Sequence, residues 1–237
     1  PWESESGSRF AISFERPGAS GVQGRFEDRV ELDGIEGDFE YPDLAAHFRW
    51  VDDWGHVLVA GMLRSIQWND LNDDEFDLSG SETGWGLNVS TNVNLGPHVL
   101  RGSVLFGEGI QNYLNDASAD IGIETDFDNL TSPIRGTAIP LAAITAFLDL
   151  NWSEEWTSTV GFSMQDNDLP DGAAGDGFAK GFYALANLLW HPVPKVLVGV
   201  ELQYAERENH SDGFKSDDFR VQFSAKYSFS ATLLGGG

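Results

Sequence analysis

A two-residue alternation of apolar and polar side chains runs through most of this chain, in segments of roughly 10 to 13 residues. In segment 219–229, Phe, Val, Phe, Ala, Tyr and Phe share one face, and Arg, Gln, Ser, Lys and Ser share the other. Segments 85–95, 142–152, 156–165 and 196–204 alternate in the same way. Because successive side chains of a strand point to opposite faces, the pattern predicts strands whose two faces meet different surroundings.

Ten strands are predicted in all. Shorter or noisier examples are 10–14, 44–50, 100–106 and 182–190, together with 56–68, whose faces are mixed. The longer segments exceed the usual strand length of about 5 or 6 residues and match the roughly 9 to 11 tilted residues that cross a bilayer. Their polar faces are rich in Gly, Ser, Thr, Asn and Gln, which suits a wall facing confined water. The sequence therefore predicts an all-β, antiparallel up-and-down transmembrane β-barrel, with a soluble all-β protein as the alternative.

The connections between the predicted strands alternate between short and long. The short links are 52–54, 96–97, 153–155 and 191–194, and the long ones are 16–41, 69–84, 108–138, 166–180 and 206–216. Outer-membrane barrels have short turns at one end and long loops at the other. Five tryptophans gather at the short links, where an aromatic belt would meet the membrane interface: Trp50, Trp54, Trp152, Trp156 and Trp190.

Composition excludes several classes of protein. The formal net charge of −24 argues against nucleic-acid binding, and the absence of cysteine excludes disulfides and thiolate metal sites. The longest apolar stretch, 138–148, is far shorter than the roughly 20 residues of a membrane-spanning helix. The chain starts at Pro1 without a signal peptide, so we expect a processed or truncated sequence.

Strand parity separates the charges. The bases with lumen parity are Arg9, Arg49, Arg64, Arg101, Lys195, Arg207, Arg220 and Lys226, against only four acids, Glu15, Asp149, Glu201 and Asp218. This predicts a cationic pore lining inside an acidic protein, which would concentrate anions. Segment 108–138 is long enough to fold inward as a constriction and carries Arg135 as its single base. The alternative is that acidic loops folded into the lumen cancel the field.

No motif for catalysis is present. The five histidines do not lie in a nucleophile-bearing motif, and neither GxSxG nor HExxH occurs. We therefore expect no enzyme activity, no cofactor and no metal site.

Several stretches together resemble the DcaP-like family of outer-membrane porins. They are PDLAAHFRW (42–50), DWGHV (53–57), AGMLR (60–64), GWGL (84–87), LRG (100–102), GEGI (107–110), LLWHPVP (188–194), REN (207–209) and RVQFSAKYSF (220–229). The resemblance implies a trimeric, sixteen-stranded channel of the Gram-negative outer membrane that passes small anions, dicarboxylates among them. It also implies a basic pore lining, and Arg49, Arg64 and Arg101 lie in matching stretches.

Two departures from this family pattern affect the interpretation. The family has further strands before the region that matches Arg9, so we expect the chain to be the C-terminal part of a larger barrel; the alternative is that its ten strands close as a small barrel. The chain continues past Phe229 into a Gly-rich tail, 230–237, whereas such barrels end at a terminal Phe.

The resulting prediction is one barrel domain, 1–229, followed by the tail. It would act as a diffusion porin whose anion-binding, pore-lining residues are Arg49, Arg64, Arg101, Arg135, Arg220 and Lys226. The expected partners are outer-membrane lipid and lipopolysaccharide, small anionic solutes and two further copies in a homotrimer, without nucleic acid. The alternatives are a structural or adhesion barrel plugged by 108–138, and a soluble acidic β-sandwich that binds carbohydrate.

Overall fold

The computed structural model describes residues 1–114 and 118–229, and the predicted Gly-rich tail lies outside them. Ten long strands dominate it, and all ten were predicted from the alternation. They are β2 (Arg9–Glu15), β4 (Asp43–Asp52), β5 (Gly55–Asp70), β6 (Gly80–Leu95), β7 (His98–Glu108), β10 (Pro140–Asn151), β11 (Trp156–Asn167), β12 (Phe178–Trp190), β13 (Val196–Asn209) and β14 (Lys215–Tyr227).

Smaller elements lie in the connections. They are β1 (Trp2–Glu3), β3 (Ile35–Asp38), β8 (Ile121–Thr125), β9 (Ile134–Ala138) and the 3-10 turns η1 (Gly24–Phe26), η2 (Val30–Leu32) and η3 (Gln111–Tyr113). None of the helices in the described part of the chain is long and apolar enough to span a membrane.

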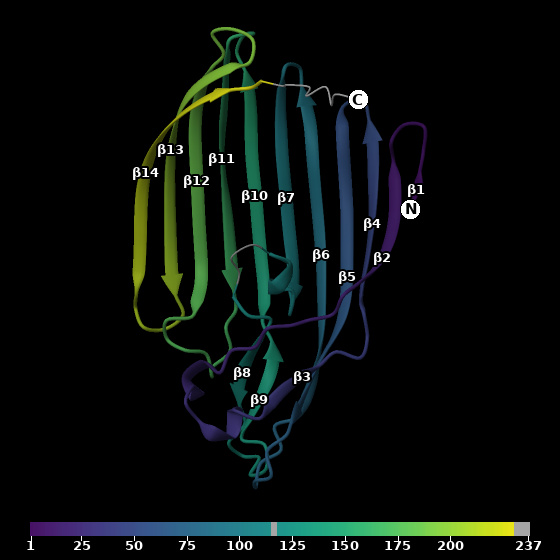
Figure 1. Cartoon of the computed structure of the whole chain (residues 1–237), viewed down its shortest axis with the longest axis vertical. Coiled ribbons are helices and arrows are strands. Elements are labelled where there is room, and N and C mark those ends of the chain that lie inside the picture. Colours follow the sequence, from purple (N-terminus) through teal and green to yellow (C-terminus); the bar gives the residue numbers. More distant parts are fainter. Residues whose placement is uncertain (115–117, 230–237) are drawn as a thin grey trace, which may run out of the picture.

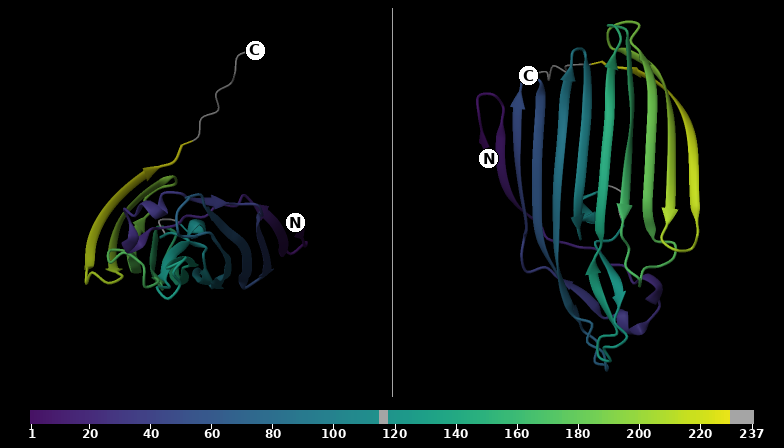
Figure 2. Two further views of the ribbon diagram at one scale, coloured as in Figure 1. Left: turned by 90° about the horizontal axis from the view of Figure 1, so that it is seen from below. Right: turned by 180° about the vertical axis from the view of Figure 1, so that it is seen from behind.

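The long strands form one continuous antiparallel meander. Their order in the sheet, β1-β2-β4-β5-β6-β7-β10-β11-β12-β13-β14, follows the chain, and β3 is added beside β5. Figure 1 shows the strands side by side, and the end-on view in Figure 2 shows the sheet curved into an arc. The sheet does not close within the described residues: β1 and β14 are its two ends. The architecture is a section of an up-and-down barrel wall. The soluble β-sandwich alternative is wrong, because the described residues form one large sheet and a β8–β9 hairpin instead of two face-packed sheets.

The cross-strand register separates a convex face from a concave one. Residues directly opposite each other on neighbouring strands share a face. Leu202 on β13, for example, lies between Ala186 on β12 and Val221 on β14, and all three belong to the convex face. Most of the exposed large apolar side chains of the long strands belong to this face, including Phe10, Phe48, Val160 and Phe223. An exposed apolar face of this extent is typical of a surface that contacts lipid or a partner.

The short turns and the long loops lie at opposite ends of the sheet, as predicted. Gly96 occupies the turn between β6 and β7 with φ 64°, a left-handed conformation that glycine adopts without a Cβ clash. Four of the five tryptophans at the short-turn end form contacting pairs: ring centroids are 5.6 Å apart for Trp50 and Trp54, and 6.0 Å apart for Trp156 and Trp190. The fifth, Trp152, lies beside His98.

The long-loop end contains a small folded layer on the concave side. Segment 108–138 supplies η3 and the β8–β9 hairpin to it, as its predicted inward fold requires, whereas the contribution of segment 16–41 was not predicted. The β8–β9 hairpin, β3 and the two N-terminal 3-10 turns gather there (Figures 1 and 2). One apolar cluster joins Leu32, Leu78, Ile123 and Ile134, and a second joins Ile66 on β5 to the hairpin. This layer explains the mixed faces predicted for 56–68. The inward positions of β5 face open space near the turn but packed loops near its other end.

The register generates a test of the two faces. Val89 lies on the convex face between Val59 and Val104, and its neighbour Ser90 lies on the concave face opposite Ser103. If the convex face contacts lipid, Val89→Arg should lower the free energy of unfolding by about 2–4 kcal/mol. Ser90→Arg should change it by about 0.5 kcal/mol or less, because the concave face is polar. Urea unfolding in lipid vesicles measures both, and equal losses for the two variants would contradict the assignment of the faces.

Candidate functional site

The concave wall near the short turns brings several bases together. Arg9 on β2 lies directly opposite Arg49 on β4, and His56 on β5 is followed across the register by Asn92 on β6 and Arg101 on β7. The Arg49 Nη2 atom lies 3.4 Å from His56 Nδ1. No carboxylate pairs with Arg9 or Arg49 within the described residues. Like charges directly opposite each other are unfavourable without a counterion, so this patch attracts anions.

Arg101 belongs to this patch but is partly neutralised. Its Nε atom donates a hydrogen bond of 2.6 Å to Asp149 Oδ2 on β10. Asp149 Oδ1 also accepts a bond of 2.9 Å from Thr159 on β11. From there polar contacts continue through Asn187 to Glu201, whose Oε2 lies 3.3 Å from the Asn187 amide nitrogen. The wall therefore changes from basic over β2–β7 to a hydrogen-bonded row with acids over β10–β13.

Arg220 and Lys226 lie on β14, at the far end of this wall. The register places Arg220 opposite Gln203 and Lys226 opposite Leu197, all on the concave face. Neither base forms an ion pair within residues 1–114 and 118–229. Both are exposed and carry a free charge on the face predicted from parity.

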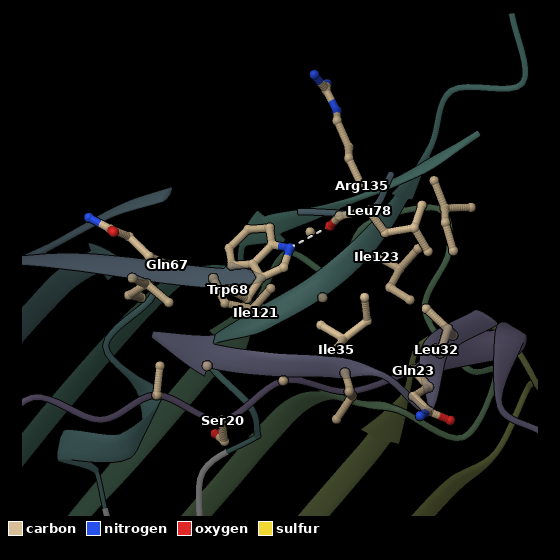
Figure 3. A pocket seen from close by; sticks show the side chains of 18 of the residues that line it. Ser20, Gln23, Leu32, Ile35, Gln67, Trp68, Leu78, Ile121, Ile123 and Arg135 are labelled. Carbon is tan, nitrogen blue, oxygen red and sulfur yellow. Dashed lines mark hydrogen bonds between the residues drawn. The ribbon is translucent and has the colours of Figure 1, made fainter. Parts of the chain in front are cut away.

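Arg135 lies on the β8–β9 hairpin, away from the strands of the wall. Its Nη2 atom is 2.7 Å from Glu124 Oε2 on the neighbouring strand of the hairpin. Figure 3 shows its side chain pointing away from the cavity beneath the hairpin. That cavity has a volume of about 270 Å³ and is largely apolar; Trp68 borders it and donates a hydrogen bond of 2.8 Å to the Leu78 carbonyl.

Arg64 is placed differently from the other predicted bases. Its side chain is only 1% exposed, because loops folded onto the concave face cover it. Nε lies 3.1 Å from Asp43 Oδ2 on β4, and Nη1 lies 3.1 Å from Asp120 Oδ1. Nη1 also donates to the Gly109 carbonyl at 2.8 Å, and Nη2 donates to the Gly18 carbonyl. We call Arg64, Asp43, Asp120 and Tyr113 the Arg64 cluster.

Tyr113 completes this cluster. Its hydroxyl donates a 2.7 Å hydrogen bond to Asp43 Oδ2, and its ring lies 5.2 Å below the Arg64 guanidinium carbon. The Asp120 carboxylate accepts bonds from the backbone N–H groups of Ser20, at 2.9 Å, and Asn112, at 3.0 Å. Each buried charge thus has oppositely charged or hydrogen-bonding neighbours, which burial of an ion requires.

Sequence reasoning did not assign Asp43 or Asp120 to Arg64, although its alternative, that acidic loops folded into the lumen pair with some of the bases, describes the Arg64–Asp120 pair. Asp43 stands just before the alternating part of β4, and Asp120 lies in a long connection without periodicity. The inward position of Glu82 opposite Ile66 was missed too, because β6 begins earlier than predicted. These acids reduce the surplus of positive charge that parity alone assigns to the concave face. Within the described residues, no group of three or more His, Cys, Asp or Glu is placed to hold a metal ion.

Comparison with known proteins supports the architecture. No known protein family matches the chain by its sequence profile. No curated protein matches it either. Among solved structures, the outer membrane channel DcaP of Acinetobacter baumannii matches with a TM-score of 0.74 and 20% sequence identity, over 96% of this chain. The match covers 60% of that channel, so this chain spans less than two thirds of its length. The NanC porin aligns with a TM-score of 0.36 and 8% sequence identity. The resemblance predicted from the sequence is confirmed at the level of the fold.

Tyr113 makes the Arg64 cluster sensitive to alkali. Burial first, and then the hydrogen bond and charge of Asp43, raise the pKa of Tyr113 from its ordinary 10 to about 12. A raised pKa favours the neutral hydroxyl in the folded state. The stability it contributes should therefore be complete below pH 10 and be lost as the pH rises through about 12.

Absorbance titration of ionised tyrosine measures this directly. The difference between the wild type and Tyr113→Phe should contain a single step near pH 12. A difference step at the ordinary tyrosine pKa would show that the hydroxyl is not held by Asp43.

Proposed function

We propose that this protein is an outer-membrane diffusion channel that passes small anionic solutes, dicarboxylates among them, and performs no chemistry on them. The observation that carries the proposal is that Arg9 and Arg49 lie opposite each other on the concave face, close to His56 and Arg101, with no carboxylate paired to either among residues 1–114 and 118–229. Anions that enter a passage with such a wall meet a favourable field, whereas small cations are repelled. Two further bases, Arg220 and Lys226, extend the field along the same face.

The convex face supports the location in a membrane. Outward positions between Trp190 and Phe182 on β12 span roughly 27 Å at about 3.4 Å per residue, close to the apolar band of outer-membrane barrels. The paired tryptophans at the short turns suit the interface with lipid headgroups. The long-loop end would then face lipopolysaccharide. The fold shared with a solved outer membrane channel agrees with this location.

The size of the passage and the assembly rest on the family resemblance. An unpaired sheet edge is very unfavourable in lipid, so a sheet with ends at β1 and β14 needs further strands to form a pore. We propose that such strands close the barrel in the complete channel and that three copies assemble as a homotrimer.

The mass of the complex in detergent, from light scattering, tests the assembly: it should equal that of three chains.

The second candidate is a barrel that is plugged and serves structure or adhesion. The folded layer on the concave side favours it, since β8, β9 and η3 all lie there. The two candidates differ in conductance, because a plug stops ions and a constriction only slows them.

Ion selectivity in a planar bilayer tests the proposed function. We expect the reconstituted protein to give stable conductance and, in a KCl gradient, a reversal potential of the sign for anion preference. Arg49→Gln should lower the anion-to-cation permeability ratio by about two- to fivefold, because it removes an unpaired charge from the wall. Lys180→Gln is the matched control: it removes a cation that pairs with Asp166 at 3.3 Å on the convex face, and it should leave the ratio unchanged.

Each outcome of this measurement decides something. A reversal potential that shows cation preference would support a channel but contradict the proposed anionic solutes, because the acidic residues would then dominate the electrostatic field of the passage. A well-inserted protein without conductance would favour the plugged barrel.

A further inference from the structure

We infer that Arg64 is a positioning residue: it clamps two inward-folded segments, 18–20 and 109–113, against the wall and thereby fixes the width of the passage beside them. This inference rests on the proposed function for its consequence, because a width matters only to a channel. It assigns Arg64 a different role from the half-buried base Arg49 and the exposed bases Arg220 and Lys226, which also face the concave side.

The contacts of Arg64 cross between segments that are far apart in the sequence. Its guanidinium meets Asp43 on a neighbouring strand of the wall, the Gly18 and Gly109 carbonyls, and Asp120. Its side chain is 1% exposed, and those of Asp43 and Asp120 are 1% and 0% exposed. A solute on the concave side therefore does not reach these charges, whereas the two segments are tied through them to β4 and β5.

The two segments also hold each other. The Ser20 hydroxyl donates a bond of 2.8 Å to Asn112 Oδ1, and both residues donate backbone N–H groups to Asp120. Movement of either segment would take its backbone N–H group away from Asp120 and its carbonyl oxygen away from Arg64, and would leave these buried charges with fewer partners. Because uncompensated buried charge is strongly unfavourable, the segments are held in one position instead of moving independently.

The wall is shaped to receive segment 109–113. Gly84, Gly86 and Gly107 all face inward on β6 and β7 at this place. A Cβ atom would lie 2.8 Å from the Ile110 side chain at Gly86 and 2.6 Å from it at Gly107. At Gly84 it would lie 2.8 Å from the Gly109 carbonyl oxygen. Only glycine leaves room for the backbone and for Ile110, which is 2% exposed.

The test compares Arg64→Gln with the wild type by two independent measurements. The first is single-channel conductance with the reversal potential. Release of the segments should raise the conductance by about 1.5-fold or more and increase current noise. Any shift of the reversal potential should be toward cations, because Asp43 and Asp120 lose their paired cation. Arg101→Gln is the matched control, because it removes an inward arginine outside the cluster. It should change the reversal potential but leave the noise as it was.

The second measurement does not depend on conduction. The chain contains no cysteine, so Ala119→Cys introduces a single thiol next to Asp120 at a position that is 7% exposed. Maleimide should label this thiol about tenfold faster or more in the Arg64→Gln background, because its cover opens more often. Ala179→Cys, at a buried position on β12, should label equally slowly in both backgrounds and controls for general unfolding.

The outcomes separate the clamp from the channel. A shifted reversal potential with Ala119→Cys still protected would overturn the inference and make Arg64 a residue that solutes contact. If Arg64→Gln speeds the labelling of Ala119→Cys but the wild type conducts nothing, the clamp is supported and the proposed function is contradicted. If Arg64→Gln does not fold, Tyr113→Phe replaces it, because it keeps all charges and removes one contact of the cluster. It should speed the labelling of Ala119→Cys to a smaller degree. An unchanged labelling rate in Tyr113→Phe would overturn the inference.

Discussion

The continuous antiparallel ladder from β2 to β14 determines where the other features of the molecule lie. Residues paired directly across strands share a face, so once the side chains of one strand are assigned to the convex or concave face, those of all the other strands are assigned too. Arg9, Arg49 and Arg101 come together because of this register, although no two of them are close in the sequence. The same register keeps the apolar side chains on the convex side, where a one-residue slip would place charges.

The buried charges have different surroundings from the exposed ones. On the open part of the wall, Arg9 is exposed and Arg49 is half-buried, and no carboxylate pairs with either in the part of the chain that the structure describes. Under the loops, Arg64 has lost its water and is surrounded by two carboxylates, two carbonyls and an aromatic ring. Two arginines that have the same parity thus have opposite surroundings: Arg49 keeps a field in the concavity, whereas the field of Arg64 is cancelled locally.

Alternation was enough to predict the strands and their faces but not what covers them. All ten long strands could be predicted because side-chain period and burial coincide on a two-faced wall. The inward fold of 108–138 was predicted from its length, but the pairing within it was not, since β8 and β9 are only five residues each and owe their pairing to clusters such as Leu32, Leu78, Ile123 and Ile134. For Arg64, parity correctly gave the face, but burial depends on Asp120 and Gly18, which are 56 and 46 positions away. The one available signal was the mixed pattern of 56–68, where Ile66 and Trp68 share the face of Arg64.

The inward glycines of β6 and β7 have a geometric consequence for the space on the concave side. An ordinary side chain at Gly86 or Gly107 would occupy the volume that Ile110 now fills. The segment that carries Ile110 therefore packs into a depression of the wall instead of lying on top of it. It therefore takes up less of the space on the concave side than it would if it lay on a wall of ordinary side chains.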